Sequence, residues 1–322
     1  MSSGPPLLSA FLNDTLAGNP DYEGLAAVIG AIAHGAIQVE AGTRRAALAG
    51  VLGYTDETNV QGEIVARLDT LGTETFVQVL RDCGQVAALA CEELEEMVHI
   101  SNAPGHPFLA VFDPVDGSSN IDVAITIGSI FGIYRRADDA DVTEQTFLRP
   151  GREQIAATYV IYGSSTVLVF AVEAGVHGFT LDPETREFVL THEDIRIPEK
   201  CSYYSVNEGN AKRWDAGVTR AVSMLREKYS QRYVGSLVAD FHRDLLKGGI
   251  FLYPGDEKSP SGKLRLSYEA NPLSYVAEQA GGAGSTGTGR IMDVVPEALH
   301  QRTPLVIGNA AEVAAVEAAI AG

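Results

Sequence analysis

The residues best suited to chemistry in this chain lie in the segment FDPVDGSSN, where an apolar run leads into two carboxylates, Asp113 and Asp116. A proline-fixed bend separates them, which places them close enough to share or bridge metal ions. Gly117 lets the backbone approach a ligand closely, and Ser118 and Ser119 add hydroxyls where a helix could begin. Cation ligands beside anion-binding N–H groups are what hydrolysis of a phosphate ester requires. The segment therefore predicts a metal-assisted phosphate site.

The alternative interpretation of this segment is an exposed turn, because Asp-Pro and Asp-Gly are common turn dipeptides. A site is favoured because an apolar strand would bring the carboxylates to its C-terminal end, where open α/β sheets bind ligands. Glu92 and Glu93 follow the apolar run 86–90 in the same way and could meet the aspartates, although acidic residues also suit the first turn of a helix. Glu269 is a lone glutamate after an apolar stretch, and it becomes a candidate ligand only in combination with these other carboxylates.

The elements that must position these side chains follow from hydrophobic periodicity. Helices are expected at 22–48 and 62–81, although Gly72 argues against one unbroken second helix. Strands are then expected at 86–90, 108–112, 121–134, 155–162 and 166–173, with a hairpin at 179–190. Beyond residue 195, strand and helix should alternate at 202–206, 211–228, 233–237, 238–247, 250–253, 271–280, 304–308 and 310–321. This pattern predicts an α/β protein with two packed lobes, 1–195 and 196–322.

Composition excludes several classes of protein. The 24 basic and 42 acidic residues give a net charge of −18, which argues against a nucleic-acid groove. Three cysteines provide no disulfide framework, and no run approaches the ~18 apolar residues of a membrane span. Since the N-terminus also lacks a signal-peptide pattern, we expect a cytoplasmic protein without a membrane partner. The segment 282–287 matches G-x-G-x-x-G but follows a helix-like stretch, so no dinucleotide site is expected.

The segment from Asp113 to Ser119 resembles the metal motif of the lithium-sensitive, inositol-monophosphatase-like phosphatase superfamily. Further motifs narrow the resemblance to class I fructose-1,6-bisphosphatase: NID at 120–122, IGSIFGIYR at 127–135, NEG at 207–209, RYVGS at 232–236, GIFLYP at 249–254 and GKLR at 262–265. The resemblance runs in collinear order over roughly residues 55–310, which is far more specific than any single pattern.

The resemblance implies a five-layered α-β-α-β-α sandwich with the sugar-phosphatase fold, usually assembled as a homotetramer. The implied reaction is hydrolysis of the 1-phosphate of fructose 1,6-bisphosphate with Mg²⁺, for which Mn²⁺ could substitute, in gluconeogenesis or the Calvin cycle. The N-terminal lobe would carry the metal motif and a degenerate allosteric region. The C-terminal lobe would bind the sugar phosphate.

The resemblance also assigns residues. The metal ligands would be Glu92, Glu93, Asp113, Asp116, Glu269 and the carbonyl of Val115. Asp69, Glu93 and Glu63 would be catalytic, with Asp69 orienting water and Glu63 standing where the family often has Asp. The 1-phosphate would contact Asp116, Gly117, Ser118 and Ser119. The sugar and its 6-phosphate would contact Asn207, Tyr233, Tyr253, Lys263 and Arg265, with Arg232 reaching in from a neighbouring subunit.

Two departures from the family pattern affect function. Asn210 replaces the third tyrosine of the 6-phosphate pocket, and Pro107-Phe108 stands where Lys-Tyr is usual in the AMP region. We therefore expect weak or absent AMP inhibition. Three alternatives stay open: dual action on sedoheptulose 1,7-bisphosphate, another phosphatase of the superfamily, and a metal-loaded binding protein without turnover.

Overall fold

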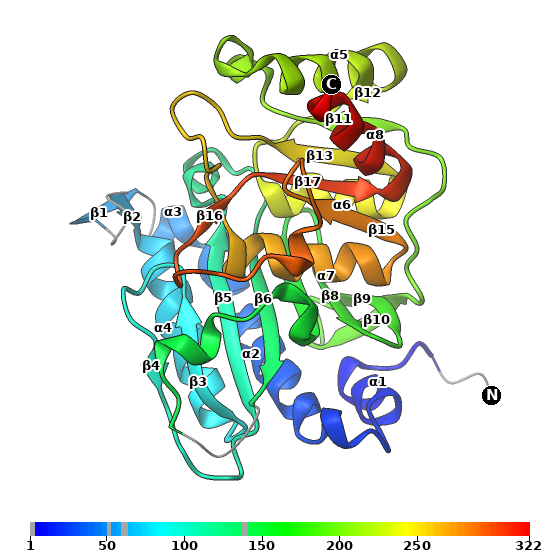
Figure 1. Cartoon of the computed structure of the whole chain (residues 1–322). Helices are drawn as coiled ribbons and strands as arrows, with labels where there is room; N and C mark the ends of the chain where they lie inside the picture. The colour runs from blue at the N-terminus through cyan, green and yellow to red at the C-terminus, as the bar shows by residue number, and fades with distance from the viewer. Residues whose placement is uncertain (1–3, 50–52, 59–63, 137–140) are drawn as a thin grey trace.

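Two β-sheets organise the molecule, a computed structural model that describes residues 4–49, 53–58, 64–136 and 141–322 (Figure 1). The larger sheet contains β3 (Val86–Cys91), β4 (Val98–His99), β5 (Phe108–Asp116), β6 (Ile127–Arg135), β7 (Gln154–Tyr162), β8 (Thr166–Val172), β9 (Gly175–Leu181) and β10 (Phe188–His192). Its order is β10-β9-β8-β7-β6-β5-β3-β4, and only β3 and β5 are parallel. The smaller sheet contains β11 (Tyr203–Ser205), β12 (Ser230–Gln231), β13 (Gly249–Tyr253), β15 (Gly282–Ser285) and β17 (Leu305–Asn309), in the order β12-β11-β13-β17-β15.

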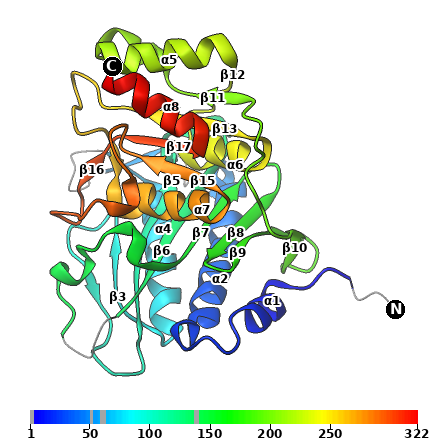
Figure 2. The ribbon, with the colours of Figure 1, turned by 45° about the vertical axis from the view of Figure 1, so that its right-hand side comes forward.

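Helices form three layers around these sheets. They are α1 (Leu8–Thr15), α2 (Leu25–Arg44), α3 (Ala46–Ala49), α4 (Arg67–Asp82), α5 (Ala216–Lys228), α6 (Leu237–Lys247), α7 (Asn271–Gln279) and α8 (Ala310–Ala321). In Figures 1 and 2, α2 and α4 cover one face of the larger sheet, α6 and α7 lie between the two sheets, and α5 and α8 cover the smaller sheet. This arrangement confirms the predicted five-layered α-β-α-β-α sandwich.

Shorter elements connect these layers. Two small ladders pair β1 (Tyr54–Thr58) with β2 (Ile64–Ala66) and β14 (Leu264–Arg265) with β16 (Arg302–Thr303). The helical turns are η1 (Pro20–Tyr22), η2 (Ser118–Val123), η3 (Glu144–Phe147), η4 (Gly151–Glu153), η5 (Glu208–Arg213), the π-helical η6 (Leu266–Ala270) and η7 (Ile291–Asp293). Of these, η2 and η6 matter for function because both carry predicted site residues.

The stretch Pro20–Arg44 is long and apolar enough to cross a membrane by length and composition alone, which the sequence analysis did not expect. In the structure its α2 portion packs against α4 and the larger sheet, and half of its most apolar window is buried. Leu25, Val28, Ile29 and Ile32 have no exposed surface. Core packing therefore accounts for the apolar character of this helix.

Gly72 lies in the interior of α4, which is unbroken there, although this glycine argued against one continuous helix in the sequence. A β-carbon at this position would lie 3.0 Å from Val115 Cγ2 and 3.2 Å from Pro114 Cβ. The glycine thus allows α4 to pack directly against the bend between the two aspartates of β5. The helix begins at Arg67, after strand β2, rather than at residue 62.

Three local predictions were wrong. The stretch 121–134 is not one strand, because Gly117 and Ala124 adopt left-handed backbone angles (φ 79° and 56°) that bound η2, and β6 starts only at residue 127. The strand predicted at 233–237 is absent, because residues 233–236 are a loop and Leu237 is the first residue of α6. Strand β15 was missed because it is glycine-rich. A β-carbon on Gly284 would lie 2.2 Å from Ser274 Oγ, so only glycine allows α7 to pack so closely.

Candidate active site

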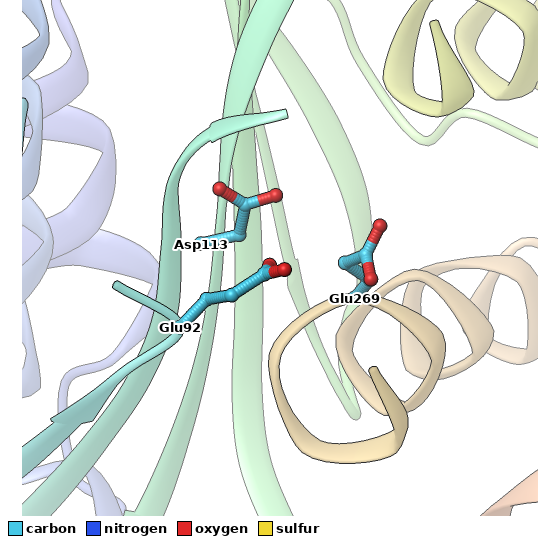
Figure 3. A group of neighbouring side chains, drawn as sticks. All are labelled: Glu92, Asp113 and Glu269. Carbon is cyan, nitrogen blue, oxygen red and sulfur yellow. The ribbon is translucent and has the colours of Figure 1, made fainter. Parts of the chain in front are cut away.

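Three carboxylates converge between the larger sheet and helix α7. Glu92, Asp113 and Glu269 each offer an oxygen, and these oxygens lie within 4.8 Å of one another. Figure 3 shows Glu92 and Asp113 extending from neighbouring strands, with Glu269 facing them from a helical turn. That turn is the π-helical η6, a geometry often found at functional sites. The aspartates are not in an exposed turn, since Asp113 is only 5% exposed.

The parallel pairing of β3 and β5 explains how Glu92 reaches this cluster. Cys91 pairs with Phe112 across the two strands, and the Glu92 N–H donates to the Phe112 carbonyl oxygen at 3.1 Å. Glu92 and Glu93 therefore emerge beside Asp113. They form a turn, and the alternative interpretation as the start of a helix is wrong.

Burial and mutual repulsion make these carboxylates hard to ionise. The pKa of Asp113 is raised well above its ordinary value by desolvation and then by the charge of Glu92 and Glu269. Glu269 shows the same upward pKa shift, caused first by desolvation and then by Glu92. Buried negative charges of this kind need a cation to be stable in the ionised form. Carboxylate oxygens are hard ligands, which suits Mg²⁺ or Mn²⁺.

Asp116 lies at the end of β5 and connects the cluster to helix α6. Its Oδ2 accepts hydrogen bonds from the Val238 N–H at 2.8 Å and the Ser236 hydroxyl at 3.3 Å. Desolvation raises the pKa of Asp116 to about 6, although these two hydrogen bonds oppose the shift. Next to it, Gly117 packs so tightly that a β-carbon would lie 3.0 Å from Ser236 Oγ. The start of η2, which carries Ser118 and the exposed Ser119, is thereby placed beside the cluster.

Arg265 is almost completely buried, with 1% of its surface exposed. Its Nε lies 3.3 Å from Glu92 Oε1, and its backbone N–H donates to Glu269 Oε2 at 2.5 Å. The guanidinium partly offsets the negative charge of the cluster and holds Glu92, while the backbone N–H of the same residue holds Glu269. The sequence analysis assigned Arg265 to the substrate. Its position beside Glu92 and Glu269 is a contact that sequence reasoning missed.

A second group of predicted residues lies in the C-terminal half of the chain. Asn207 and Tyr253 line one small cavity together with Asn210 and Trp214. The pKa of Tyr233, which is partly exposed, is raised to about 12 by desolvation and then by the charge of Tyr253. The structure thus brings Asn207 and Tyr253 to one cavity, with Tyr233 in the surface loop that precedes α6.

Asn210 occupies the position at which a tyrosine was expected. Its Oδ1 accepts a hydrogen bond from Arg213 Nη2 at 2.5 Å, and Arg213 Nε lies 2.8 Å from Asp256 Oδ2. Because the guanidinium donates to the amide oxygen, the amide group has a defined orientation, with its NH₂ group available for another partner.

The remaining predicted residues differ in their exposure. Arg232 is exposed, with its guanidinium carbon 5.5 Å from the centre of the Tyr203 ring. Lys263 is exposed, whereas Asp69 is buried in the first turn of α4. Glu63 lies outside the described residues.

Arg135, a basic residue in the expected AMP region, is paired within the chain. The guanidinium of Arg135 lies over the Phe108 ring, 6.0 Å from its centre. Arg135 also donates to the Asp21 carbonyl oxygen at 3.0 Å and lies 3.7 Å from the Asp21 carboxylate. An acidic side chain therefore already accompanies Arg135, which makes this guanidinium less available to an anion.

The layered fold and the buried acidic cluster define a metal-dependent phosphoric monoester hydrolase. A family model described as the N-terminal domain of fructose-1-6-bisphosphatase matches residues 10–193, and the model of its C-terminal domain matches residues 197–321. The chain belongs to the fructose-1,6-bisphosphatase family.

Individual relatives agree with this assignment. A class 1 fructose-1,6-bisphosphatase of Sorangium cellulosum is 53% identical over 290 residues, which is 87% of this chain and 83% of the relative. A cytosolic fructose-1,6-bisphosphatase of Brassica napus is 48% identical over 282 residues, 85% of this chain and 83% of the relative. The crystal structure of Leishmania major fructose-1,6-bisphosphatase in holo form is 38% identical, with a TM-score of 0.94 over 99% of this chain and 100% of that one.

Proposed function

We propose that this protein hydrolyses the 1-phosphate of D-fructose 1,6-bisphosphate, giving fructose 6-phosphate and inorganic phosphate. The observation that carries the proposal is the buried Glu92–Asp113–Glu269 cluster in a chain of this family. Gluconeogenesis or the Calvin cycle would use such a reaction. The cytosolic names of several plant relatives support a cytoplasmic location.

Mg²⁺, with Mn²⁺ as a substitute, is the proposed cofactor. Glu92, Glu93, Asp113, Asp116, Glu269 and the Val115 carbonyl would hold it. When bound, it would neutralise charge on the phosphate and lower the pKa of an attacking water. This explains how a protein of net charge −18 can bind a doubly phosphorylated sugar.

Residues of the chain would bind the 1-phosphate, orient the attacking water and assist proton transfer. The backbone around Gly117, Ser118 and Ser119 would bind and orient the 1-phosphate. Buried Asp69 would orient water, and Glu93, together with Glu63 outside the described residues, would assist proton movement.

The 6-phosphate end would be bound away from the reacting atoms. Asn207, Tyr233 and Tyr253 would donate hydrogen bonds to the sugar and its phosphate, while Lys263 would supply positive charge there. Arg265, which lies beside Glu92 and Glu269, would supply positive charge at the metal cluster and the 1-phosphate instead. Arg232 would reach this phosphate in a neighbouring subunit of a homotetramer. Its exposure supports that role, because an exposed guanidinium is available to another chain. The lobe 1–195 would then carry the metal motif, and the lobe 196–322 would bind the sugar phosphate and contribute Glu269 to the metal cluster.

A substrate panel tests this proposal. We expect the highest kcat/KM with fructose 1,6-bisphosphate and little activity with inositol monophosphates. Activity on sedoheptulose 1,7-bisphosphate would fit a dual enzyme, since that sugar carries the same two terminal phosphates. A higher kcat/KM with an inositol or nucleotide phosphate would refute the proposal and favour another phosphatase of the superfamily.

A further inference from the structure

Beneath the predicted 6-phosphate residues lies a carboxylate that no assignment above uses. Asp240, in the first turn of α6, has no exposed surface. Its Oδ1 and Oδ2 each lie 3.0 Å from the Val234 backbone nitrogen, and Oδ2 also accepts from the Gly235 N–H at 3.0 Å. The loop above it is at the surface, with Tyr233 and Val234 37% and 39% exposed. The buried Asp240 carboxylate thus binds the backbone N–H groups of an exposed loop from the interior of the protein.

Arg243, one turn further along α6, completes this arrangement. Its Nη2 donates to Asp240 Oδ1 at 2.8 Å, to the Arg232 carbonyl oxygen at 3.2 Å and to Ser205 Oγ at 2.5 Å. Both ends of the Arg232–Gly235 loop are therefore bound to the same ion pair. Burying a charged pair costs free energy unless hydrogen bonds satisfy it, and here the loop backbone supplies several of them.

The opposite side of the loop is bound to the phosphate-binding segment. Asn120 Nδ2 donates to the Gly235 carbonyl oxygen at 3.0 Å, and Asp116 accepts from Ser236 and Val238 as described above. The segment 232–238 thus lies between the metal motif and the Asp240–Arg243 pair. Its backbone has little freedom to move relative to the site.

We propose that Asp240 is a positioning residue that sets Arg232 and Tyr233 in place for the distal phosphate of the substrate, acting through the loop backbone and Arg243. The inference rests on the proposed function of Arg232 and Tyr233. An apolar residue would be enough to pack α6 at this place. A carboxylate is needed because the loop presents N–H groups without strand partners.

Asp240→Asn tests this role. One of the two acceptor oxygens becomes an NH₂ group that must face a backbone N–H or the Arg243 guanidinium, so one contact is lost. Asp244→Asn is the matched control, since Asp244 is equally buried on the same helix and also lies beside Arg243 but makes no hydrogen bond to the loop. Three quantities are measured with Mg²⁺ present: KM for fructose 1,6-bisphosphate, Ki for the product fructose 6-phosphate, and kcat.

For Asp240→Asn we expect KM and the Ki of fructose 6-phosphate to rise about tenfold, the size of one lost charge-assisted hydrogen bond, while kcat and the half-saturating Mg²⁺ concentration change little. Asp244→Asn should leave KM and Ki unchanged. If Asp240→Asn does not fold, Arg243→Lys replaces it, because a lysine can pair with Asp240 but cannot also reach the Arg232 carbonyl oxygen and Ser205. It should raise KM and Ki in the same direction, by a smaller factor.

The positioning role would be overturned if Asp240→Asn had the same KM and Ki as the control Asp244→Asn. If Arg243→Lys is used in its place, the same comparison with the control applies. A fall in kcat with unchanged KM would overturn it too, because that result describes general damage rather than loss of distal-phosphate binding. If the unmodified protein binds no fructose 6-phosphate, the proposed function itself is refuted, and the positioning role with it.

Discussion

Replacing one carboxylate of the acidic cluster should stabilise the metal-free protein while abolishing its response to metal. Glu269→Gln keeps the shape of the side chain and an oxygen that can accept from the Arg265 N–H. The pKa of Glu269 is raised well above its ordinary value, which means that the folded protein disfavours the ionised form. A neutral side chain removes this unfavourable interaction at any pH where Glu269 would be charged.

The magnitude follows from the geometry of the cluster. Two unit charges at the 4.8 Å limit of this cluster repel by about 3 kcal/mol at an effective dielectric constant of ~20. Glu92 and Asp113 both repel Glu269, whereas the Arg265 guanidinium attracts it, so we estimate a net gain of about 2–4 kcal/mol. For a chain of 322 residues that gain corresponds to a rise in Tm of about 3–6 °C.

Thermal unfolding at pH 8, with chelator and with saturating Mg²⁺, measures the effect. With chelator, Glu269→Gln should unfold at the higher temperature. With Mg²⁺, the unmodified protein should gain stability by ligand binding and the variant should gain little. The exposed control Glu297→Gln should behave as the unmodified protein does under both conditions.

The pH dependence has a defined sign. Since the folded-state pKa of Glu269 lies above its ordinary value of 4.5, the metal-free protein loses stability as pH rises above about 4.5 toward that raised pKa. The difference between Glu269→Gln and the unmodified protein should therefore vanish near pH 4 and grow toward pH 8. A variant that unfolds at a lower temperature than the unmodified protein in chelator, or an equal Mg²⁺ response in both, would refute the reasoning.

Four further predictions follow from other parts of the molecule. Asp116→Asn should lower kcat by orders of magnitude in a phosphate-release assay, and near-normal turnover would contradict its role as a ligand. Arg232→Ala should raise KM more than it lowers kcat. Mixed oligomers of Arg232→Ala and Asp116→Asn chains should regain sites of high affinity, and no recovery would show that the arginine is not shared between subunits. Burial lowers the pKa of His242 from 6.5 to about 4, so stability should fall as pH falls through this range, and His242→Gln should flatten that part of a Tm-against-pH curve. Micromolar AMP should inhibit weakly or not at all, because Pro107 and Phe108 supply neither a cation nor a phenol; potent cooperative inhibition would contradict this.

Much of the site could be predicted because its residues are adjacent in the chain. The run from Asp113 to Ser119 carries its own signal, and the apolar strand before it predicts burial. Glu92 depended on a parallel pairing of β3 with β5, which places the two strand ends together. The local sequence around Glu92 suits a helix start equally well, so only the sheet distinguishes the two.

Other features could not be predicted because they depend on contacts between distant segments. From the sequence alone Gly72 suggests a break in the helix. The structure shows that a glycine is required there because Pro114 and Val115 pack directly against it. The 233–236 segment has the apolar and aromatic character of a strand, but a buried carboxylate at Asp240 takes its N–H groups instead. Strand β15 escaped detection because its glycines are required by packing rather than by strand propensity.

The most direct test of the central claim is phosphate release from fructose 1,6-bisphosphate, measured with Mg²⁺, after addition of a chelator, and after Mg²⁺ is restored. The account predicts turnover that disappears with chelator, returns with Mg²⁺ and yields fructose 6-phosphate as the only sugar product. Metal binding without turnover would contradict it and indicate a binding protein. So would release of phosphate that continues at the same rate in chelator.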